Sequence, residues 1–552
     1  FPYKYYPIDR LTNGGAIGII NEAGNNEDKK WTIEDKQQFI NNINSINGCG
    51  ISDSTFDMWK YAEFYCQQDV RILRLSFTAF SNGFIKDFKI DPHNFISISS
   101  LANEVFNQHV YYNHNLYRIG GIVRKFCSHA VYGGRCMCAY NKKWHTKTPL
   151  CDFDAVSLYP SAMKRLYTVE GKPKVITPEQ LNMDFLSKTS AYVVEIRINK
   201  VNKHYPFPLI VQKVNGINVN DDNMKRSDDE GVHFDPINMV VDNIYLEDLI
   251  NFQHIEFTLL RGYYWDGKKD YTIQDTISML FNKRLEYKKQ HNHLQQLYKL
   301  IMNSCYGKTI ERPVEKDYKY LHEGPELEKY WYKNYNKIVE DIKLNNSNIH
   351  AVKVVKQIDK HFNFSLLGIQ VLSMSKRIMN EAMCLAFDIG CRIYYQDTDS
   401  YMIAKEDLPK LSESFKQKYG RELIGSNLGQ FHCDFPSINN HDEMPWSVEA
   451  YFLMKKMYIH KITDSTGDVD YVIRGKGLTL ASIQHVAQSE YNNDYMKLYN
   501  DLYNGNIITF DLTQGQPCFS MNKNMTVSTV EKFTRTIKVK YEEGDRNKYF
   551  NS

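Results

Sequence analysis

The 552-residue chain has no run of apolar residues long enough to cross a membrane, and no secretory signal peptide opens it. A membrane-spanning helix needs about 18 or more consecutive apolar residues, so we expect no membrane partner. Internal repeats and low-complexity linkers are also absent, which excludes repeat architectures. A chain of 64.7 kDa without these features is typical of a globular protein with several subdomains.

Zinc-type Cys-x-x-Cys pairs are missing as well, although the chain has 11 cysteines. An odd number of cysteines in a long chain favours free thiols, and we therefore expect an intracellular, reducing compartment. One stretch gathers cysteine and histidine side chains, namely Cys127, His129, Cys136, Cys138, His145 and Cys151. A metal site there is a minor alternative, because Cys-x-Cys spacing fits tetrahedral zinc poorly.

The chain also lacks a large net charge of either sign. The formal net charge is +3, which is too small for binding nucleic acid through overall charge in the manner of histones. Any contact with DNA must therefore come from local basic patches.

Two carboxylates stand at the bend of a predicted β-hairpin, in the segment Tyr395-Gln396-Asp397-Thr398-Asp399-Ser400. Apolar residues flank this segment on both sides, so Asp397 and Asp399 fall at the bend. Carboxylate oxygens displayed in this way suit hard divalent cations. Asp and Thr are also common turn residues, and for this segment alone an ordinary turn is the open alternative.

A second predicted strand also ends in a carboxylate. Alternation places Cys151 and Phe153 on one face of this strand and Asp152 and Asp154 on the other. Pro160 then suits the first turn of a helix. The pattern predicts an acidic residue where a strand ends and a helix leads away.

A predicted helix carries a polar face opposite an apolar one. At helical spacing the polar face holds Lys299, Asn303 and Tyr306, and the apolar face holds Leu294, Leu297, Ile301 and Cys305. Continued backwards, the polar face includes Arg284 and Lys288. The result is a cationic ridge anchored by an apolar stripe, with an ordinary solvated face as the alternative.

In chain order, the three segments resemble the sequence signatures of family B DNA polymerases. Residues 154–160 are similar to the family's Asp-x-x-Ser-Leu-Tyr-Pro, residues 299–307 to Lys-x-x-x-Asn-Ser-x-Tyr-Gly, and residues 395–400 to Tyr-x-Asp-Thr-Asp-Ser. Two matches are weaker: Tyr132-Gly133-Gly134 resembles Tyr-x-Gly-Gly without its intervening residue, and Lys456-Met457-Tyr458 resembles Lys-x-Tyr. The resemblance covers about residues 1 to 480 and is closest to the protein-primed branch of viruses, linear plasmids and related mobile elements.

The resemblance implies an α+β fold of the right-hand polymerase type, in which a palm with an antiparallel sheet, helical fingers and a thumb follow a remnant of an RNase H-like exonuclease domain. The expected boundaries are 1–90 for the exonuclease remnant, 105–165 for the first part of the palm, 166–271 for the insertion of the protein-primed branch, 272–312 for the fingers, 313–361 for a second insertion, 362–477 for the second part of the palm and 478–552 for the thumb. The fingers are short enough for two antiparallel helices. Within the first insertion, the Asn- and Asp-rich stretch from Val214 to Asp235 predicts an exposed loop.

The chemistry expected of such a site is nucleotidyl transfer. It needs an activated 3′-hydroxyl, an electrophilic α-phosphate and neutralisation of the leaving pyrophosphate. Two Mg²⁺ ions about 3.5 to 4 Å apart supply all three when carboxylates hold them, and Mn²⁺ is the expected substitute. Asp154 and Asp399 are the expected catalytic metal ligands. Asp397 is the third catalytic residue, an auxiliary that positions metal or primer.

The helix face is expected to bind the incoming nucleotide. The residues assigned to its β- and γ-phosphates are Lys299, Arg284 and Lys288, and Asn303 belongs to the same motif. The resemblance implies that Tyr306 stacks near the nascent base pair. Tyr159 would pack beneath the ribose, where its ring would clash with a 2′-hydroxyl. Ordinary core packing is the alternative for both tyrosines.

Two further segments are expected to contact DNA. In Tyr132-Gly133-Gly134-Arg135, the glycine pair lets the backbone approach a phosphate chain closely and Arg135 adds charge, with a plain turn as the alternative. The second segment is an apolar strand pattern from Phe452 to His460 that adjacent lysines interrupt. The resemblance implies that Lys456 touches primer phosphates and that Tyr458 shapes the minor-groove side.

The N-terminal region resembles only the end of an exonuclease domain. Tyr65 and Asp69 match the family's last exonuclease motif, Tyr-x-x-x-Asp, on an amphipathic helix predicted from about Phe56 to Leu75. The two earlier motifs are not found between Phe1 and Tyr65, and the chain begins with Phe rather than Met. We therefore expect a fragment that lacks its upstream exonuclease half and has no 3′→5′ exonuclease activity.

The expected function is that of a DNA-directed DNA polymerase that replicates a viral or mobile-element linear genome. Its expected partners are template–primer DNA, deoxynucleoside triphosphates and a terminal protein that primes synthesis, and the chain is expected to act as a monomer. A catalytically inactive DNA-binding protein derived from an integrated element is the alternative from another class. A reverse transcriptase is less favoured, because its acidic turn has adjacent aspartates and Thr398 separates them here.

Overall fold

The structure is a computed structural model that describes residues 17–19, 33–112, 115–214, 217–228, 231–312, 314–344, 347–356, 362–439, 443–512, 518–522, 525–530 and 533–539. The chain divides into two compact units, Phe1–Ile96 and Ser97–Ser552. Among the helices of these described ranges, none is long and apolar enough to span a membrane.

The first unit joins a small antiparallel sheet to two helices. Its elements are β1 (Ile17–Ile19), α3 (Ile33–Ser45), β2 (Gly50–Ser52), β3 (Thr55–Asp57), α4 (Met58–Phe88) and η1 (Pro92–Asn94), with strand order β1-β3-β2. Phe39, Phe56 and Tyr61 form its core through edge-to-face contacts.

Helix α4 is longer than the predicted Phe56–Leu75. It begins after Asp57, whose carboxylate accepts the backbone N–H groups of Trp59 and Lys60. It ends only at Lys89, which adopts the left-handed conformation with φ 60°. Apolar residues continue beyond Leu75, with Phe84 and Phe88 buried, and no proline precedes that cap, so the helix continues through Gly83.

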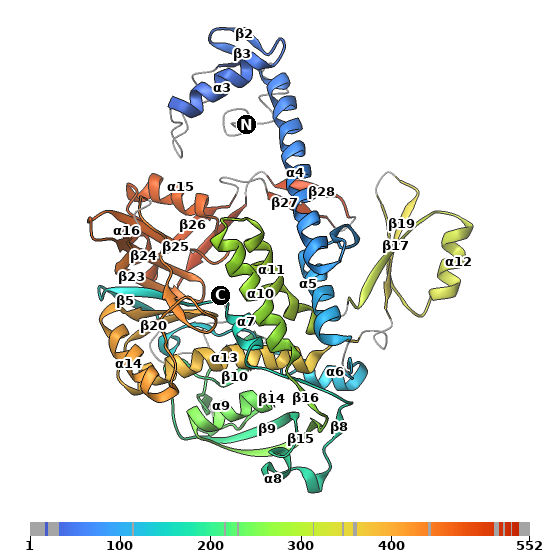
Figure 1. The fold of residues 1–552 in the computed structure, drawn as a ribbon, viewed down its shortest axis with the longest axis vertical. Helices are drawn as coiled ribbons and strands as arrows, with labels where there is room; N and C mark the ends of the chain where they lie inside the picture. The colour runs from blue at the N-terminus through green and yellow to red at the C-terminus, as the bar shows by residue number, and fades with distance from the viewer. Residues whose placement is uncertain are drawn as a thin grey trace. The chain divides into compact units, whose positions relative to one another are not determined.

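The second unit is built on a nine-stranded antiparallel sheet (Figure 1). Its strand order is β25-β24-β23-β6-β21-β20-β4, with β22 paired to β6 and β5 paired to β23. The strands are β4 (Cys136–Cys138), β5 (Trp144–Thr146), β6 (Leu150–Ala155), β20 (Ile393–Asp397), β21 (Ser400–Ala404), β22 (Phe431–Cys433), β23 (Trp446–Met454), β24 (Met457–Thr463) and β25 (Val469–Arg474). The alternation predicted for β6 is confirmed, since Cys151 and Phe153 are buried while Asp152 and Asp154 are half-buried.

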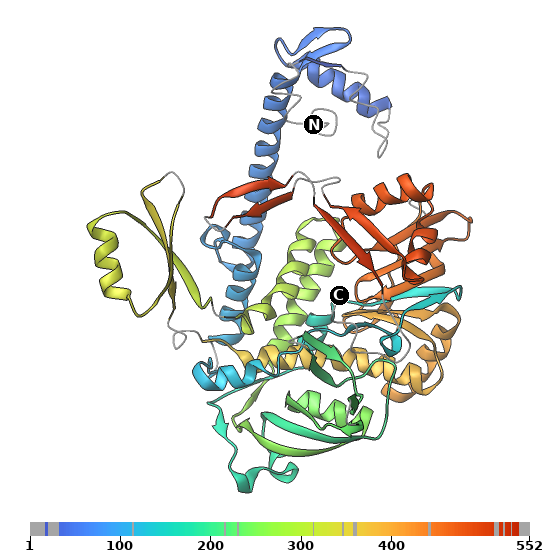
Figure 2. The same cartoon turned by 180° about the vertical axis from the view of Figure 1, so that it is seen from behind.

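A long buried helix, α13 (Ser365–Asp388), runs through this unit and packs against helices on two sides. It lies between α9 (Asn243–Gln253) and α11 (Leu294–Thr309), as both ribbon views show (Figures 1 and 2). It also contacts the short α7 (Leu158–Met163), which follows β6 directly. The helix that the sequence places after the acidic strand is therefore present, with Pro160 in its first turn.

Two adjacent helices form the hairpin that was predicted for residues 272–312. These are α10 (Thr272–Lys289) and α11, and they pack against each other. Leu297, Ile301 and Cys305 are buried, whereas Lys299 is exposed and Asn303 is half-buried. The two faces predicted for α11 are thus confirmed. Next to this hairpin lie α5 (Ile98–Phe106) and η2 (Asn107–Tyr111), whereas α6 (Gly121–Ser128) packs against α13.

A second antiparallel sheet, in the order β14-β9-β15-β8, lies on the α9 side of α13. Its strands are β8 (Lys174–Val175), β9 (Ala191–Val201), β14 (Ile237–Asp242) and β15 (Ile255–Trp265). The exposed loop predicted for residues 214–235 is wrong: this region forms the hairpins β10–β11 (Val211–Val214, Ile217–Asn220) and β12–β13 (Lys225–Asp228, Gly231–Phe234). The residues pair as strands rather than forming a continuous loop, and Met224 between the hairpins is buried in the core.

The remaining elements form two peripheral groups. The first is the sheet β17-β19-β18 with a helix: β17 (Lys316–His322), α12 (Pro325–Asn334), β18 (Ile338–Lys343) and β19 (Ile349–Val355). The second follows β25: α15 (Leu480–Tyr491), α16 (Tyr495–Tyr503), β26 (Ile507–Asp511), β27 (Cys518–Met521), β28 (Val527–Val530) and β29 (Thr534–Lys538). Smaller elements are η3 (Ala139–Asn141), β7 (Thr168–Val169), η4 (Pro178–Gln180), α8 (Met183–Leu186), β16 (Lys269–Asp270), η6 (Lys405–Asp407) and α14 (Leu408–Tyr419).

Candidate active site

Strand register brings the acidic residues of two distant segments onto one face of the nine-stranded sheet. Asp397 of β20 pairs with Ser400 of β21, and Ser400 pairs with Asp154 of β6. Directly opposed residues of antiparallel strands point to the same face. The same row continues to Cys136 of β4 at one end and His432 of β22 at the other. The two acidic segments predicted from the sequence therefore meet.

Backbone hydrogen bonds hold Asp399 beside the end of β6. The Asp399 carbonyl accepts the N–H of Ala155 at 2.8 Å, and the Asp399 N–H donates to the Asp397 carbonyl at 2.7 Å. Between the two aspartates, Thr398 has φ 61°, a conformation that a β-branched residue rarely adopts. The predicted bend is confirmed, and its tip is a tight, strained turn.

The glycine pair lies against this turn. A Cβ added to Gly134 would come within 2.5 Å of the Thr398 side chain, while Gly133 faces open space. The N–H of Thr398 donates to the carbonyl of Arg135 at 2.8 Å. Gly134 thus permits close approach of two protein segments, which is a different use from the approach to phosphate that the sequence suggested.

Burial and like charges raise the pKa values of the site carboxyls. Burial raises the pKa of Asp154 to about 8, and the charge of Asp399 adds to this effect, whereas Lys299 opposes it. Burial likewise raises the pKa of Asp399, with a further contribution from Asp397. Asp152, on the same face of β6 as Asp154, has its pKa raised by burial to about 7. The site carries more negative charge than the protein itself neutralises.

These carboxylates fit a magnesium site that is completed by substrate. Among the described residues, no three His, Cys, Asp or Glu side chains form a ready-made metal site. Mg²⁺ usually binds through one or two carboxylates together with substrate phosphates, and the crowded pair Asp154 and Asp399 is a donor set of that kind. The Cys- and His-containing stretch from Cys127 to Cys151 also forms no such group.

Lys456 lies at the tip of the β23–β24 hairpin, with φ 59°. The interruption predicted at the lysines between Phe452 and His460 is therefore a hairpin turn, at which the chain reverses. The Lys456 ammonium is 2.9 and 3.1 Å from the two carboxylate oxygens of Asp397. Its backbone N–H donates to the Tyr395 hydroxyl at 2.8 Å. Lys456 thus neutralises one of the three predicted catalytic residues.

Three residues predicted to contact DNA are turned into the protein. Arg135 is 5% exposed and hydrogen-bonds to protein groups, so the prediction that it adds charge to a DNA surface is wrong. Tyr458 is 6% exposed and packs against Tyr395 beneath the site, which leaves it no direct reach to a groove. Tyr132 packs edge-on against Tyr245 in the core on the α9 side.

The residues predicted to bind the nucleotide gather above the acidic row. Tyr159 of α7 stacks on Tyr306 of α11, with ring centroids 4.2 Å apart and planes inclined by 25°. An Arg284 N–H lies 3.5 Å from the hydroxyl of Ser157, and its buried Nε has no protein partner. Lys288, one helical turn further along α10, is exposed. The structure brings these two tyrosines together, and their contact with a nucleotide stays a prediction.

The predicted exonuclease residues lie in the first unit. Tyr65 is half-buried and Asp69 exposed, one helical turn apart on α4. The absence of exonuclease activity stays a prediction.

Three site residues were not predicted from the sequence. His432 is the cross-strand partner of Asp154, Asp434 adds negative charge that raises the pKa of Asp154, and Ser157 has φ 48° at the start of α7. Residues 431–434 alternate like a short strand, which was the available signal. Their proximity to β6 depends on pairing between segments far apart in sequence.

Solved structures with a similar fold include phi29 DNA polymerase. Its complex with primer–template DNA matches 81% of this chain and 68% of the phi29 chain, with 15% identity and a TM-score of 0.56. Its complex with primer–template DNA and incoming nucleotides matches the same shares at 15% identity with a TM-score of 0.53. The chain therefore has the right-hand polymerase fold, and the α+β fold predicted from the sequence is confirmed.

The family is shown by sequence. A model described as "DNA polymerase type B, organellar and viral" matches residues 23–367, more than half of the chain. The chain belongs to this family of DNA polymerases, as its motifs predicted.

Two relatives are similar over shorter stretches. A DNA polymerase of Acidianus bottle-shaped virus (isolate Italy/Pozzuoli) is 55% identical over 40 residues, which are 7% of this chain and 6% of that protein. Uncharacterized protein 075R of Invertebrate iridescent virus 3 is 24% identical over 150 residues, which are 26% of this chain and 86% of that protein. The chain thus spans a small part of the first relative's length.

Proposed function

We propose that this chain is a DNA-directed DNA polymerase that adds deoxynucleotides to a primer 3′-hydroxyl. The observation that carries the proposal is the register that aligns Asp154, Ser400 and Asp397 and leaves Asp399 beside Asp154. A buried, acidic site with raised pKa values is typical of a catalytic centre. Family membership supports the same activity.

Asp154 and Asp399 would hold two Mg²⁺ ions, or Mn²⁺ in their place. When bound, the ions would activate the 3′-hydroxyl and neutralise charge on the leaving pyrophosphate. The two carboxylates must be ionised for this role, and their raised pKa values mean that cation binding displaces protons. Asp397, already paired with Lys456, would position the primer end rather than carry full cation charge.

Lys299 would meet the triphosphate. Its ammonium is exposed, yet its charge lowers the pKa of Asp154, so the lysine and the carboxylate share one electrostatic environment. A triphosphate lying between α11 and β6 would gain an attractive contact from Lys299. The unpartnered Nε of Arg284 offers a second donor on the same side.

The stacked rings of Tyr159 and Tyr306 would form the surface beneath the incoming sugar and base. The ring of Tyr306, on α11, stacks on the ring of Tyr159, so Tyr159 has little freedom to move aside. A 2′-hydroxyl on the sugar would therefore meet the Tyr159 ring. This arrangement supports selection of deoxynucleotides.

We further propose that synthesis starts from a terminal protein as well as from a DNA primer. The proposal rests on residues 166–271 and 313–361, each of which contains a sheet of its own and a helix, and on the protein-primed branch that the motifs resemble. The phi29 structures are complexes with primer–template DNA, one of them with incoming nucleotides as well, which supports the same ligands here. The role would be replication of a viral or mobile-element linear genome.

Primer extension tests the proposal. A labelled primer on a DNA template is incubated with Mg²⁺ and either deoxy- or ribonucleotides, using the wild type, Asp399→Asn, and Glu413→Gln from the surface of α14 as the control. Extension with deoxynucleotides by the wild type and the control, and none by Asp399→Asn, supports the function. DNA binding without extension by any of the three would favour an inactive DNA-binding protein instead.

A further inference from the structure

The Arg135 side chain is buried, and all its N–H groups are used within the protein. Its Nε donates to the Gln396 side chain, one terminal nitrogen donates to the carbonyls of Phe207 and Pro208 at 3.0 and 3.3 Å, and the other to the Asn380 amide oxygen at 3.0 Å. The last N–H faces the Met383 sulfur at 3.7 Å. Burying a guanidinium is costly unless it is hydrogen-bonded throughout, so these partners fix the position of the Arg135 side chain.

Arg135 holds the residues on both sides of Asp397. Gln396, which precedes Asp397 in β20, is 1% exposed and points to the core face of the sheet. The backbone carbonyl of Arg135 accepts the N–H of Thr398, which follows Asp397. One residue thus holds the catalytic turn through its side chain and its backbone at once.

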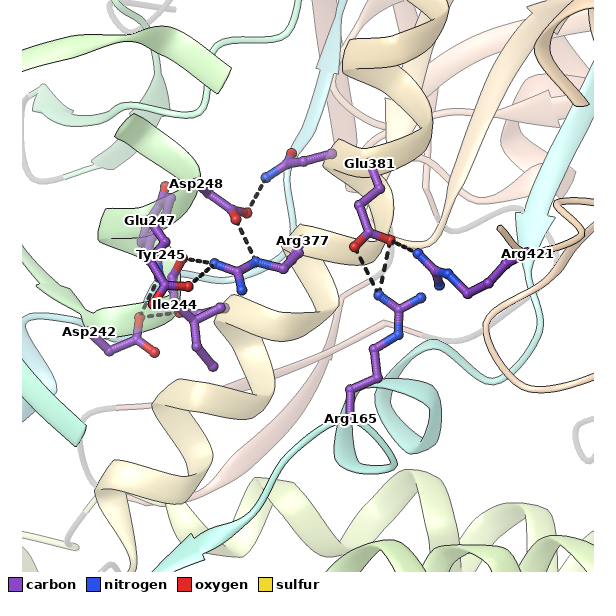
Figure 3. Close-up of polar contacts among 11 residues, drawn as sticks. Arg165, Asp242, Ile244, Tyr245, Glu247, Asp248, Arg377, Glu381 and Arg421 are labelled. Atoms are coloured by element: carbon purple, nitrogen blue, oxygen red, sulfur yellow. Dashed lines mark hydrogen bonds and ion pairs between the residues drawn. The ribbon is translucent and has the colours of Figure 1, made fainter. Parts of the chain in front are cut away.

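The other end of this contact chain is anchored in two helices. The Asn380 amide on α13 donates to Asp248 on α9 at 3.0 Å. Arg377 donates to the same carboxylate at 2.6 Å (Figure 3). Asp248 is 1% exposed. Arg135 therefore connects the strand that carries Asp397 to a rigid, buried part of the fold.

We propose that Arg135 is a positioning residue that fixes the Asp397-Thr398-Asp399 turn for catalysis. Thr398 has φ 61°, and such a backbone persists only where the surroundings impose it. The bonds from Arg135 on either side of Asp397 are that constraint. Without them the turn relaxes, and the two aspartates move relative to Asp154. The inference rests on the proposed function, because it assigns Arg135 a part in the same site.

The test compares Arg135→Lys with Arg421→Lys in the full chain. Lysine keeps the charge at position 135 but cannot reach Gln396, Phe207 and Asn380 together. We expect kcat for primer extension to fall about 10²-fold, with KM for the nucleotide and the Kd for primer–template within about twofold of the wild type. Arg421 is the control, since it is an arginine whose ion pair goes to Glu381 of α13 rather than to Asp248. Its variant should lose melting temperature without this loss of kcat.

A second variant and a second readout keep the inference testable if Arg135→Lys does not fold. Gln396→Met removes only the acceptor on β20, and it should lower kcat in the same direction. Mn²⁺ binding, followed by electron paramagnetic resonance without DNA, should weaken about tenfold in either variant, as for other residues that orient metal ligands.

The outcomes separate the inference from the proposed function. If the wild type extends primers and a folded Arg135→Lys or Gln396→Met variant keeps its kcat within about threefold, Arg135 has a purely structural role and the inference is overturned. If the wild type extends no primer, the proposed function fails, and the Mn²⁺ titration still decides: unchanged affinity in both variants overturns the inference. A raised Kd for DNA with unchanged kcat would also overturn it.

Discussion

The ion pair between Lys456 and Asp397 predicts that removing the lysine charge has opposite effects on the affinities for a divalent cation and for DNA. The Lys456 ammonium lies 2.9 Å from Asp397, and the two side chains are 56% and 19% exposed. Lys456→Met keeps most of the apolar part of the side chain and removes its charge. Because the lysine is largely exposed, solvent screening limits the pair to about 0.3–1 kcal/mol. We therefore expect the free energy of unfolding to fall by no more than this.

The same substitution should strengthen cation binding. Without the ammonium beside Asp397, the acidic site loses a competing positive charge, so Mn²⁺ affinity in the absence of DNA should rise about two- to fivefold, which corresponds to the energy above. Primer–template affinity should instead fall, and its salt dependence should decrease by about one phosphate contact.

Titration of Mn²⁺ by electron paramagnetic resonance at low salt measures the first effect, and fluorescence anisotropy of a labelled duplex across a salt series measures the second. Lys455→Met is the control, because it removes the same charge from the neighbouring, exposed position of the turn and should change Mn²⁺ affinity less. Weaker Mn²⁺ binding by Lys456→Met would refute the reasoning, since it would mean that the lysine supports the cation site rather than competing with it.

Three further predictions follow from particular contacts. Burial lowers the pKa of Lys376 to about 8, so the unfolded chain binds this proton more tightly. The free energy of unfolding should therefore rise from pH 8 to 10.5 by up to about 3 kcal/mol relative to that of Lys376→Met. Denaturation measurements that give both proteins the same pH dependence would contradict this. Tyr159→Val should raise ribonucleotide incorporation by about 10²-fold relative to deoxynucleotides, whereas an unchanged ratio in single-nucleotide extension would remove Tyr159 from sugar selection. Gly134→Ala should press its new methyl group on Thr398, costing about 1–3 kcal/mol of stability and lowering kcat, while Gly133→Ala, which faces open space, should do neither.

Local patterns predicted the parts of the site that depend on residues close together in the sequence. The two-residue period of a strand separated Asp154 from Phe153, and the helical period separated Lys299 from Ile301; both separations appear in the structure. The bend at Asp397 to Asp399 was also predicted, because polar turn residues stood between apolar strand residues.

Open choices and errors arose where a residue's surroundings come from elsewhere in the chain. Lysines within an apolar run could mark an irregular strand or a hairpin turn, and the choice at Lys456 is made with help from the hydroxyl of Tyr395, 61 positions away. Arg135 carries a charge that suggests exposure, yet its partner Gln396 lies 261 positions along the chain. Neither environment can be inferred from the residues that are adjacent in the sequence.

The sequence by itself determined which chemical groups are present, which face of each strand or helix they occupy, and the family to which the chain belongs. Only the tertiary structure decided that Asp397, Ser400 and Asp154 stand in one row, that burial raises the pKa of Asp154, and that Arg135 points inward. The physical reason is that periodicity acts within one element, whereas register, burial and charge interactions arise when elements from distant parts of the chain pair and exclude water.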